Sequence, residues 1–301
     1  MKIIENRKKF YALSLIVILI GLLAMGINAA KGKGFFEQDI EFTGGSYIQF
    51  DLGTPLTNDI RKELVNITAE VTGDKNPRIT SADETGVIIT VQRVDNEKRT
   101  ALYNAIKEKY NLTAVAPLAH EDFSATISNE IKWGAIKAVV VGVILILIYI
   151  SFRFKDYKFG VSAVMALVHD VLVMLTVYAV FRIPLNNSFI AAMLTIVGYS
   201  INDTIIVFDR IRENKGRKGY KAQQGVPSEV VNDSISQTMS RSIWTSLTTM
   251  IMVILLYILG TDQVKEFALP IIVGVGAGTY SSIFIASPLW FDLSNAKKSN
   301  K

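Results

Sequence analysis

The sequence predicts an α-helical polytopic membrane protein with six transmembrane helices and one small α+β domain of ferredoxin-like order outside the membrane. Three observations support this prediction. Half of the 301 residues are hydrophobic, and the mean hydropathy is +0.32. Six segments stay mostly apolar over the roughly 20 residues that a helix needs to cross a bilayer. A single polar stretch, 31–132, lies between the first two segments and is too long for a bare loop.

The composition excludes several kinds of chemistry. The chain has no cysteine, which rules out a disulfide framework, thiol catalysis and a cysteine-based metal site. His120 and His169 are the only histidines, so a histidine-rich metal site is disfavoured and no resident cofactor is expected. The 32 lysine and arginine residues exceed the 27 aspartate and glutamate residues, giving a net charge of +5. Membrane proteins reach such a balance through cytoplasmic loops, so we expect no nucleic-acid partner.

The apolar segments are taken as helices in chain order. They are 11–30, 133–152, 159–181, 188–208, 242–261 and 267–291. The first is also compatible with a cleaved signal peptide, because Lys8 and Lys9 precede it and small residues follow. Its apolar run is too long for a typical signal peptide and no clean cleavage site ends it, which favours a retained helix.

Lysine and arginine gather on one side of these helices. The amino end, the second-to-third and fourth-to-fifth connections and the tail are rich in them, whereas the other two short loops hold only Arg182 and Lys265. Positive residues stay cytoplasmic, so we expect a multi-pass protein of the inner (cytoplasmic) membrane with both termini in the cytoplasm. The expected divisions are the amino end with the first helix (1–30), the external domain (31–132), helices two to six (133–291) with a cytoplasmic loop (209–241), and a cytoplasmic tail (292–301).

The polar stretch has the order β-α-β-β-α-β, which is typical of a ferredoxin-like domain. Its 12 basic residues against 16 acidic residues give a net charge of −4. Period-two alternation, helical spacing of apolar residues and capping residues define the elements. They are a strand at 46–51, a helix capped by Thr57 that runs to Thr72, strands at 78–81 and 87–94, a helix at 95–110 and a last strand at 112–117.

Asp203 is the most informative charge in the apolar segments. It lies six residues before Asp209, where the apolar run ends, so it sits roughly 9 Å inside the cytoplasmic boundary. A carboxylate at that depth costs on the order of 2.5–3.5 kcal/mol unless it is paired, protonated or hydrated. A structural aspartate satisfied by a neighbouring helix is the simpler reading, and a transport or proton-relay role is favoured over it. Arg241, just before the fifth segment, is a candidate partner at similar depth, although topology alone also explains an arginine there.

His169 and Asp170 lie about ten residues into the third segment, roughly 15 Å from its start. Adjacent helix positions point about 100° apart, so the two side chains need not share a partner. Asp170 falls on the face of Ala163 and Ala166, small residues that allow close helix packing. A structural role and a role in a proton relay remain equally open for this pair.

Three other patterns are weak. Gly274-Val-Gly-Ala-Gly278 resembles part of a phosphate loop, but it lies inside an apolar segment and its spacing suits helix–helix contact. No Walker A motif occurs, so we expect no ATPase activity and no enzyme. Asp170 and Asp203 lack the glycine-flanked motif of an intramembrane aspartyl protease.

Four motifs occur in a recognisable order. They are Glu41-Phe42-Thr43-Gly44-Gly45, Ala166-Leu-Val-His-Asp170, the stretch from Gly198 to Glu213 with Asn202, Asp203, Asp209 and Arg210, and the segment from Ser236 to Ser246 around Arg241. With the six-helix layout, these motifs resemble the SecF family of protein-translocase subunits over nearly the whole chain. Glu41 replaces the usual aspartate and Trp244 stands where an aliphatic residue is more common.

The resemblance implies partners and an energy source. SecF-like chains pair with SecD in a twelve-helix assembly related to the RND transporters, of which this chain supplies an RND-like half. The pair promotes the export of a preprotein through the SecYEG channel, with proton-motive force or, in some members, sodium. A YajC-like accessory protein and membrane lipid complete the implied partners. In the family, the residues matching Asp203 and Arg241 belong to the ion pathway, and Asn202, Asp170 and His169 are further candidates.

The expected mechanism is a two-state change. Protonation of Asp203 weakens its attraction to Arg241, the fourth and fifth helices repack, and the external domain tilts through the first and second helices. Two alternatives stay open. One is an RND-type efflux half-transporter for small hydrophobic substrates, although the external domain is small and polar for that task. The other is a translocon scaffold that transduces no energy.

Overall fold

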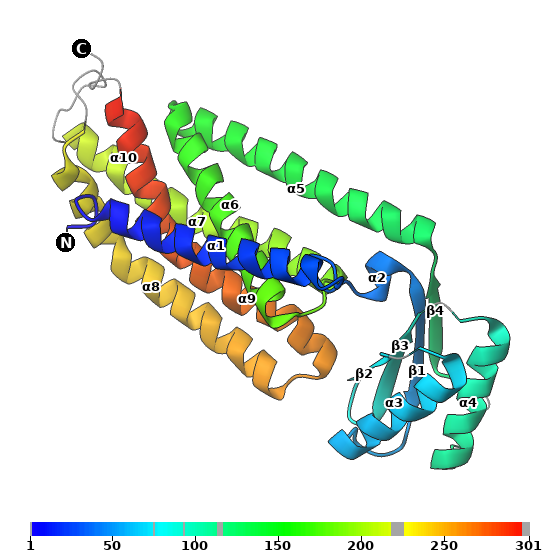
Figure 1. Cartoon of the computed structure of the whole chain (residues 1–301). Helices are drawn as coiled ribbons and strands as arrows, with labels where there is room; N and C mark the ends of the chain where they lie inside the picture. Colours follow the sequence, from blue (N-terminus) through cyan, green and yellow to red (C-terminus); the bar gives the residue numbers. More distant parts are fainter. Residues whose placement is uncertain (1, 75, 93, 113–116, 218–225, 297–301) are drawn as a thin grey trace.

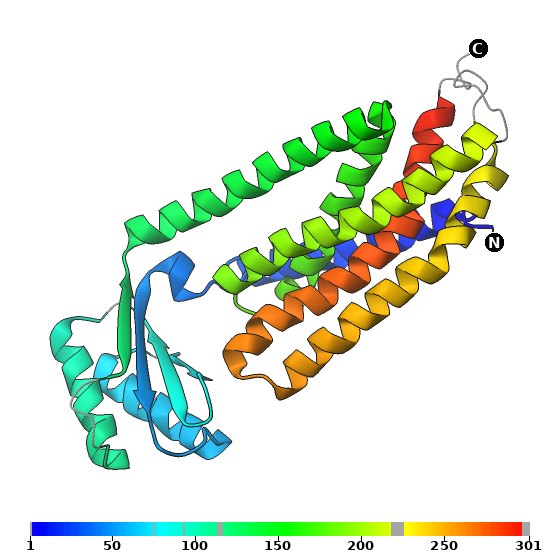
Figure 2. The same ribbon diagram turned by 180° about the vertical axis from the view of Figure 1, so that it is seen from behind.

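The computed structural model describes residues 2–74, 76–92, 94–112, 117–217 and 226–296. A bundle of long helices carries a small α+β domain at one end, and both chain termini lie at the opposite end (Figure 1). In the view from behind, the middle of α5 lies apart from the other helices (Figure 2). We call the two ends of the bundle the domain-side end and the terminal end.

Within the described residues, six helices are long and apolar enough to cross a membrane, as the sequence predicts. They are α1 (Arg7–Ala30), α5 (Ala125–Phe154), α6 (Tyr157–Phe181), α7 (Asn187–Arg217), α8 (Ser228–Leu259) and α9 (Asp262–Ser281), the last continued by the π-helix η2 (Ser282–Ala286) and by α10 (Ser287–Asn295). Several helices extend well beyond their apolar runs. The end of α7 continues through polar residues that form ion pairs at helical spacing, which support a helix outside the apolar layer.

Three helices form the centre of the bundle. In α6, α7 and the final span, 44, 44 and 56% of the most apolar window is buried, against 11, 6 and 17% in α1, α5 and α8. The apolar faces of α1, α5 and α8 therefore point outward, as expected of helices that face lipid or another membrane protein.

The α+β domain between α1 and α5 has the predicted ferredoxin-like order. Its elements are α2 (Ile40–Thr43), β1 (Gly45–Asp51), α3 (Asn58–Thr72), β2 (Arg78–Ser81), β3 (Gly86–Val91), α4 (Asn96–Tyr110) and β4 (Ala119–Phe123). The antiparallel sheet has the order β2-β3-β1-β4. Thr57 and Asp95 cap α3 and α4. Apolar residues of both helices pack on one face of the sheet, so its other face is free to meet the bundle.

The last strand is not where the sequence places it. Of the predicted range 112–117, residues 113–116 lie outside the described part of the chain, and the strand that pairs with β1 is β4, Ala119–Phe123. This edge strand is mostly exposed and contains His120 among other polar residues, so burial imposes no alternating apolar pattern on it. The third strand also ends earlier than predicted, at Val91.

Two apolar clusters fill the bundle, and a polar layer separates them. Toward the terminal end, Phe159 stacks on Trp290 with ring centroids 4.5 Å apart. Toward the domain-side end, Tyr178 packs on Phe189 at 4.5 Å. Between these clusters, α6, α7 and α9 carry buried carboxyl and hydroxyl groups.

Candidate functional site

Asp170 of α6 is the most completely bonded group of this polar layer. Only 1% of the residue is exposed. One carboxylate oxygen, Oδ2, accepts hydrogen bonds from Ser200 Oγ of α7 at 2.6 Å and from Ser281 Oγ of α9 at 2.9 Å. The other, Oδ1, lies 3.0 Å from Nδ1 of His169. Asp170 thus joins the three central helices at one point.

The ring of His169 bonds directly to the carboxylate of its neighbour, Asp170. Its ring also stacks on Tyr280 of α9, with centroids 5.8 Å apart. The Tyr280 hydroxyl donates to the backbone oxygen of Phe10 in α1 at 3.0 Å and lies 3.4 Å from Ser14 Oγ. The cluster around Asp170 therefore reaches α1 through Tyr280.

Asp203 of α7 is buried to the same extent, with 2% of the residue exposed, but it has fewer partners. Ser246 Oγ of α8 donates to Asp203 Oδ2 over a long 3.5 Å. The same serine accepts a 2.6 Å hydrogen bond from Thr279 Oγ1 of α9 and lies 3.4 Å from the Tyr199 hydroxyl. Asp203 is thus the weakly held end of a chain of hydroxyl groups that leads to α9.

Close packing of α7 on α9 brings these groups together. A Cβ atom on Gly274 would meet Ile196 at 2.5 Å, and one on Gly278 would meet the Cβ of Ser200 at 2.9 Å. The helices touch through these two glycines, which confirms that the glycine-rich stretch serves helix–helix contact. This approach allows Ser200 and Ser281 to donate to a single oxygen of Asp170.

Arg241 does not form the predicted pair with Asp203. Its side chain is exposed and lines a cavity of about 800 Å³ between α7 and α8, together with Asp209 and Glu213. Among the described residues, no ion pair or hydrogen bond joins it to Asp203. Ser246, the residue that bonds Asp203, lies five positions further along α8, or about 7.5 Å. Arg241 therefore sits nearer the terminal end than Asp203 does.

The other predicted residues of α7 lie outside the cluster. Asn202 is exposed, because it points about 100° away from the buried Asp203 on the same helix. Gly198 is also exposed, and a Cβ there would meet nothing within 4 Å. Asp209 and Arg210 form ion pairs at the surface beyond the polar layer.

The motif at 41–45 joins α2 to the first strand of the sheet. Phe42 is buried, and Gly44 has a φ of 83°, a left-handed conformation that glycine adopts without strain. A Cβ on Gly45 would meet the backbone oxygen of Val91 at 2.6 Å, so no larger residue fits between β1 and its neighbour β3. This motif is far from the polar layer and shapes the α+β domain.

The two polar residues of the same motif have different contacts, one to the bundle and one within α2. Glu41 accepts a hydrogen bond from the backbone N–H of Asn187, the first residue of α7. Burial raises the pKa of the Glu41 carboxyl above its usual value, although this hydrogen bond opposes the rise. Thr43 donates to the backbone oxygen of Asp39 at 3.1 Å. Glu41 is thus a contact between the domain and the bundle.

Reasoning from sequence missed the hydroxyl groups of the cluster. Four short side chains form the interhelical hydrogen bonds that surround the two carboxyl groups: Ser200, Ser246, Thr279 and Ser281. Serine and threonine are common in apolar helices, where they often bond their own backbone, so their number alone gives little signal. Ser200 stands three residues before Asp203, and that spacing on one helix face is the signal that was available.

No metal centre is visible in the parts of the chain that the structure describes, where no three histidine, aspartate or glutamate side chains gather. The fold and the polar layer define a multi-pass membrane protein whose central helices enclose two carboxyl groups, and whose α+β domain rests on one end of the bundle.

Comparison with known proteins identifies the family. The C-terminal family of the protein export membrane proteins SecD/SecF matches residues 104–296. The protein translocase subunit SecF of Sebaldella termitidis is 34% identical, over 100% of this chain and 94% of its own length. The corresponding subunit of Petrotoga mobilis is 35% identical, over 98% of this chain and 96% of its own length. The chain therefore belongs to the SecD/SecF family of protein export membrane proteins, which supports a role as an accessory subunit of the Sec translocase.

Longer relatives bear on the partner. The translocase subunit SecDF of Thermus thermophilus is 36% identical over 94% of this chain, which covers 38% of that protein. A crystal structure of SecDF from the same organism, described as a translocon-associated membrane protein, superposes with a TM-score of 0.76 at 34% identity. The chain covers 39% of that structure. A relative in which a SecD part and a SecF part form one polypeptide suggests association with a SecD-type chain.

Proposed function

We propose that this chain is the SecF-type subunit that, with a SecD-type partner, uses an ion gradient to promote the late stages of protein export through a SecYEG-type channel. The observation that carries the proposal is Asp203. This carboxyl group is buried in the centre of an apolar bundle, and one hydrogen bond of 3.5 Å joins it to the rest of the described chain. Carboxyl groups in such positions are typical of ion pathways.

The sparse bonding of Asp203 suits a group that changes its protonation state. Adding a proton to Asp203 disturbs one weak contact, to Ser246, whereas the same change at Asp170 would disturb two short hydroxyl contacts and the contact to His169. Each proton that moves down a potential of 100 mV supplies about 2.3 kcal/mol. That energy exceeds the worth of a single typical hydrogen bond, so the weak Asp203 contact can be broken and remade in each cycle.

Arg241 belongs to the proposed ion path as a positive charge at its opening, and it is not a direct partner of Asp203. It lines the cavity at the terminal end of α7 and α8, where ions that leave Asp203 reach water. Replacing Arg241 by lysine keeps the charge but loses the planar guanidinium, so we expect part of the export activity to be lost. His169 and Asp170 form the fixed wall of the path, and Asn202 lies outside it.

The orientation follows from the distribution of charge. We place both termini in the cytoplasm and the α+β domain, which carries a net charge of −4, on the outer side, where an exported chain emerges. The outward apolar faces of α1, α5 and α8 then meet lipid, the SecD-type partner and a YajC-like accessory protein. The cycle needs a coupling ion, H⁺ or Na⁺, and neither a resident cofactor nor hydrolysis of ATP by this chain.

The test compares Asp203→Asn with Glu229→Gln. Glu229 lies exposed in the first turn of α8, so its variant removes a carboxylate outside the proposed path. We expect Asp203→Asn to abolish the stimulation of preprotein export by an imposed gradient in inverted vesicles, and Glu229→Gln to retain it. Parallel proton and sodium gradients identify the coupling ion.

Gradient-stimulated export at the wild-type level in Asp203→Asn vesicles would show that Asp203 has no role in coupling and would favour a scaffold. Export of a hydrophobic dye, in the absence of any effect on preproteins, would favour an efflux half-transporter.

A further inference from the structure

The domain-side end of α9 holds the α+β domain through two carboxylates. Asp262 Oδ2 accepts from Arg61 Nη2 and from the backbone N–H of Ser81, each at 3.0 Å. One turn further along, Glu266 forms an ion pair with Arg78 and accepts from Asn186 Nδ2. Arg61 belongs to α3, and Ser81 and Arg78 to β2, so α9 is bonded directly to the body of the domain.

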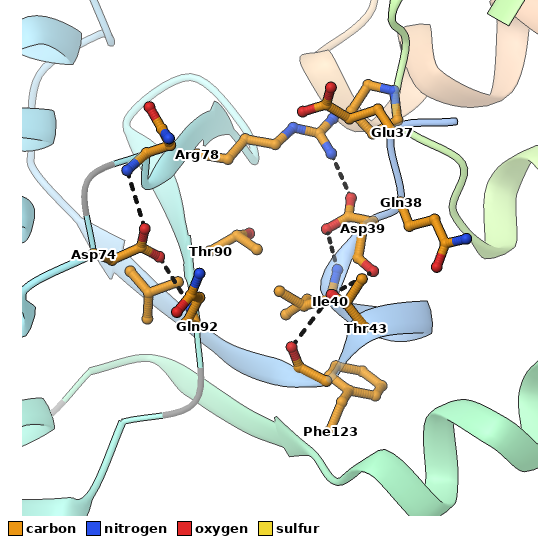
Figure 3. Close-up of a pocket in the computed structure, with 14 residues that line it drawn as sticks. Glu37, Gln38, Asp39, Ile40, Thr43, Asp74, Arg78, Thr90, Gln92 and Phe123 are labelled. Atoms are coloured by element: carbon orange, nitrogen blue, oxygen red, sulfur yellow. Dashed lines mark hydrogen bonds and ion pairs between the residues drawn. The ribbon is translucent and has the colours of Figure 1, made fainter. Parts of the chain in front are cut away.

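Arg78 is the centre of this contact. Its guanidinium pairs with Glu266 through Nη2 and with Asp39, the capping residue of α2, through Nη1. Figure 3 shows the Arg78 side chain reaching from β2 toward Asp39. The Arg78, Asp39 and Glu266 side chains are only 29, 14 and 24% exposed, so these ion pairs are less screened by water than ordinary surface pairs.

Little else fills the interface around Arg78. A cavity of about 660 Å³ lies on one side of it, lined by Asp39, Thr90 and Phe123 among others. A second cavity of about 510 Å³ lies between the open face of the sheet and the end of the bundle, beside a hydrogen bond between the side chains of Tyr47 and Gln263. A few ion pairs and hydrogen bonds therefore hold the domain, rather than continuous apolar packing, and a contact of that kind permits relative motion.

The same helix bonds the polar layer at its other end. Ser281, 15 residues or about 22 Å after Glu266, donates to Asp170. Thr279 donates to Ser246, which in turn donates to Asp203. Immediately after Ser281 the chain changes from α-helix to the π-helix η2, a local widening that often marks functional positions in helices.

The two helices that are covalently joined to the domain, α1 and α5, contact the polar layer less directly than α9 does. The carboxyl partners described above come from α6, α7, α8 and α9, whereas α1 reaches the layer through Tyr280, itself a residue of α9. From the domain, α5 runs outside the centre and packs on α2 and α6. A route through α9 is therefore shorter than the expected route through the first and second transmembrane helices.

We propose that α9 couples the intramembrane carboxyl groups to the position of the α+β domain, and that Arg78 is the positioning residue that holds the domain to α9. This inference rests on the proposed function and specifies how a change at Asp203 reaches the domain. A change in the contacts of Thr279 and Ser281 shifts α9, which contains Pro270 between these residues and Glu266. Asp262 and Glu266 carry that shift to Arg61, Ser81 and Arg78.

The absence of cysteine makes a direct distance measurement possible. Cysteines introduced at Glu108, on the exposed face of α4, and at Leu259, at the domain-side end of α8, take spin labels at these two positions alone. Pulsed electron paramagnetic resonance on the full chain in lipid nanodiscs then reports the distance between domain and bundle. The variants are Asp203→Asn, Arg78→Gln and the double variant Asp203→Asn with Arg78→Gln.

Arg99→Gln is the matched control. Arg99 also forms an ion pair, with Asp122 at 3.1 Å, but that pair lies within the domain and does not reach α9. We expect Arg78→Gln to broaden the distance distribution and to raise the undocked population about tenfold, which corresponds to about 1.4 kcal/mol. Arg99→Gln is expected to keep the narrow wild-type distribution.

The double variant tests whether Arg78 is needed to couple Asp203 to the position of the domain. We expect Asp203→Asn to move the main distance peak in the wild-type and Arg99→Gln backgrounds and to move nothing in the Arg78→Gln background. A narrow distribution in Arg78→Gln, or an equal shift with and without Arg78, would overturn the proposal.

Export assays on the same variants separate this inference from the proposed function. Loss of gradient-stimulated export in Asp203→Asn with no movement of the domain would leave the proposed function standing and overturn the route through α9. Movement of the domain with export that ignores the gradient would support the route and overturn the proposed function.

Discussion

Asp170 and Asp203 are equally buried carboxyl groups in neighbouring helices, and their surroundings differ in every other respect. Asp170 has two short hydroxyl donors and a histidine. Among the described residues, Asp203 has one hydroxyl donor, Ser246, at 3.5 Å. The contrast teaches that two equally buried carboxyl groups can differ in how firmly they are bonded, and under the proposed function only the weakly bonded one couples to the ion.

The difference arises from which helices meet at each level. At Asp170, the glycine contact between α7 and α9 closes the bundle and aims Ser200 and Ser281 at one oxygen. At Asp203 the partner helix is α8, which lies at the edge of the bundle and is 17% buried in its most apolar window. A looser neighbour leaves room for a carboxyl group to change its contacts.

The largest effect is expected from removing the better-bonded carboxyl group. Asp170→Ala leaves the hydroxyl groups of Ser200 and Ser281 without their acceptor and opens a cavity in the core, so it should lower the free energy of unfolding by about 3 kcal/mol or more. Asp203→Ala should lower it by no more than about 1 kcal/mol. Trp290, which is fully buried, provides a fluorescent probe of unfolding in detergent. Equal losses in the two variants would remove the distinction between a structural and a coupling carboxyl.

A smaller effect tests the packing that builds the Asp170 cluster. In Gly278→Ala, the new Cβ meets the Ser200 Cβ at 2.9 Å, so α7 and α9 must separate at a cost of about 1–3 kcal/mol. The control Gly276→Ala points to an exposed position where the nearest atom, Met250 Cε, is 3.9 Å away. It should be neutral, or more stable by up to about 1 kcal/mol, because alanine favours helix over glycine. Thermal unfolding measures the stability of the two variants. Similar melting temperatures would argue against a tight contact between α7 and α9.

The smallest effect compares the hydroxyl donors of the two carboxyl groups. Ser200→Ala removes a 2.6 Å bond to a carboxyl group and should cost about 1.5 kcal/mol. Ser246→Ala removes the 3.5 Å bond to Asp203 and an acceptor of Thr279 and Tyr199. Thr279 keeps the backbone oxygen of Val275 as an acceptor and Tyr199 keeps Thr249 Oγ1, so this variant should cost less, about 0.5 kcal/mol. Chemical unfolding of both variants measures the difference, and a larger loss in Ser246→Ala would reverse the assignment.

The sequence determined the large features of this protein because they depend on local composition. Six apolar runs of the required length give six helices, and capping residues such as Thr57 and Asp95 locate the helices of the α+β domain. The glycines at 274 and 278 were assigned to helix contact for the same local reason. The edge strand β4 escaped prediction, because an exposed polar strand carries no apolar alternation.

The tertiary structure alone decided how the buried charges are arranged. The sequence places Asp203 and Arg241 at similar depth, but depth along a helix does not fix the direction in which a side chain points or which helix stands opposite. The packing of α7 on α9 and α8 gave Asp203 a serine instead of the arginine, and gave Asp170 two donors from separate helices. The bond from α9 to the domain through Glu266 and Arg78 joins residues 188 positions apart, which no local pattern encodes.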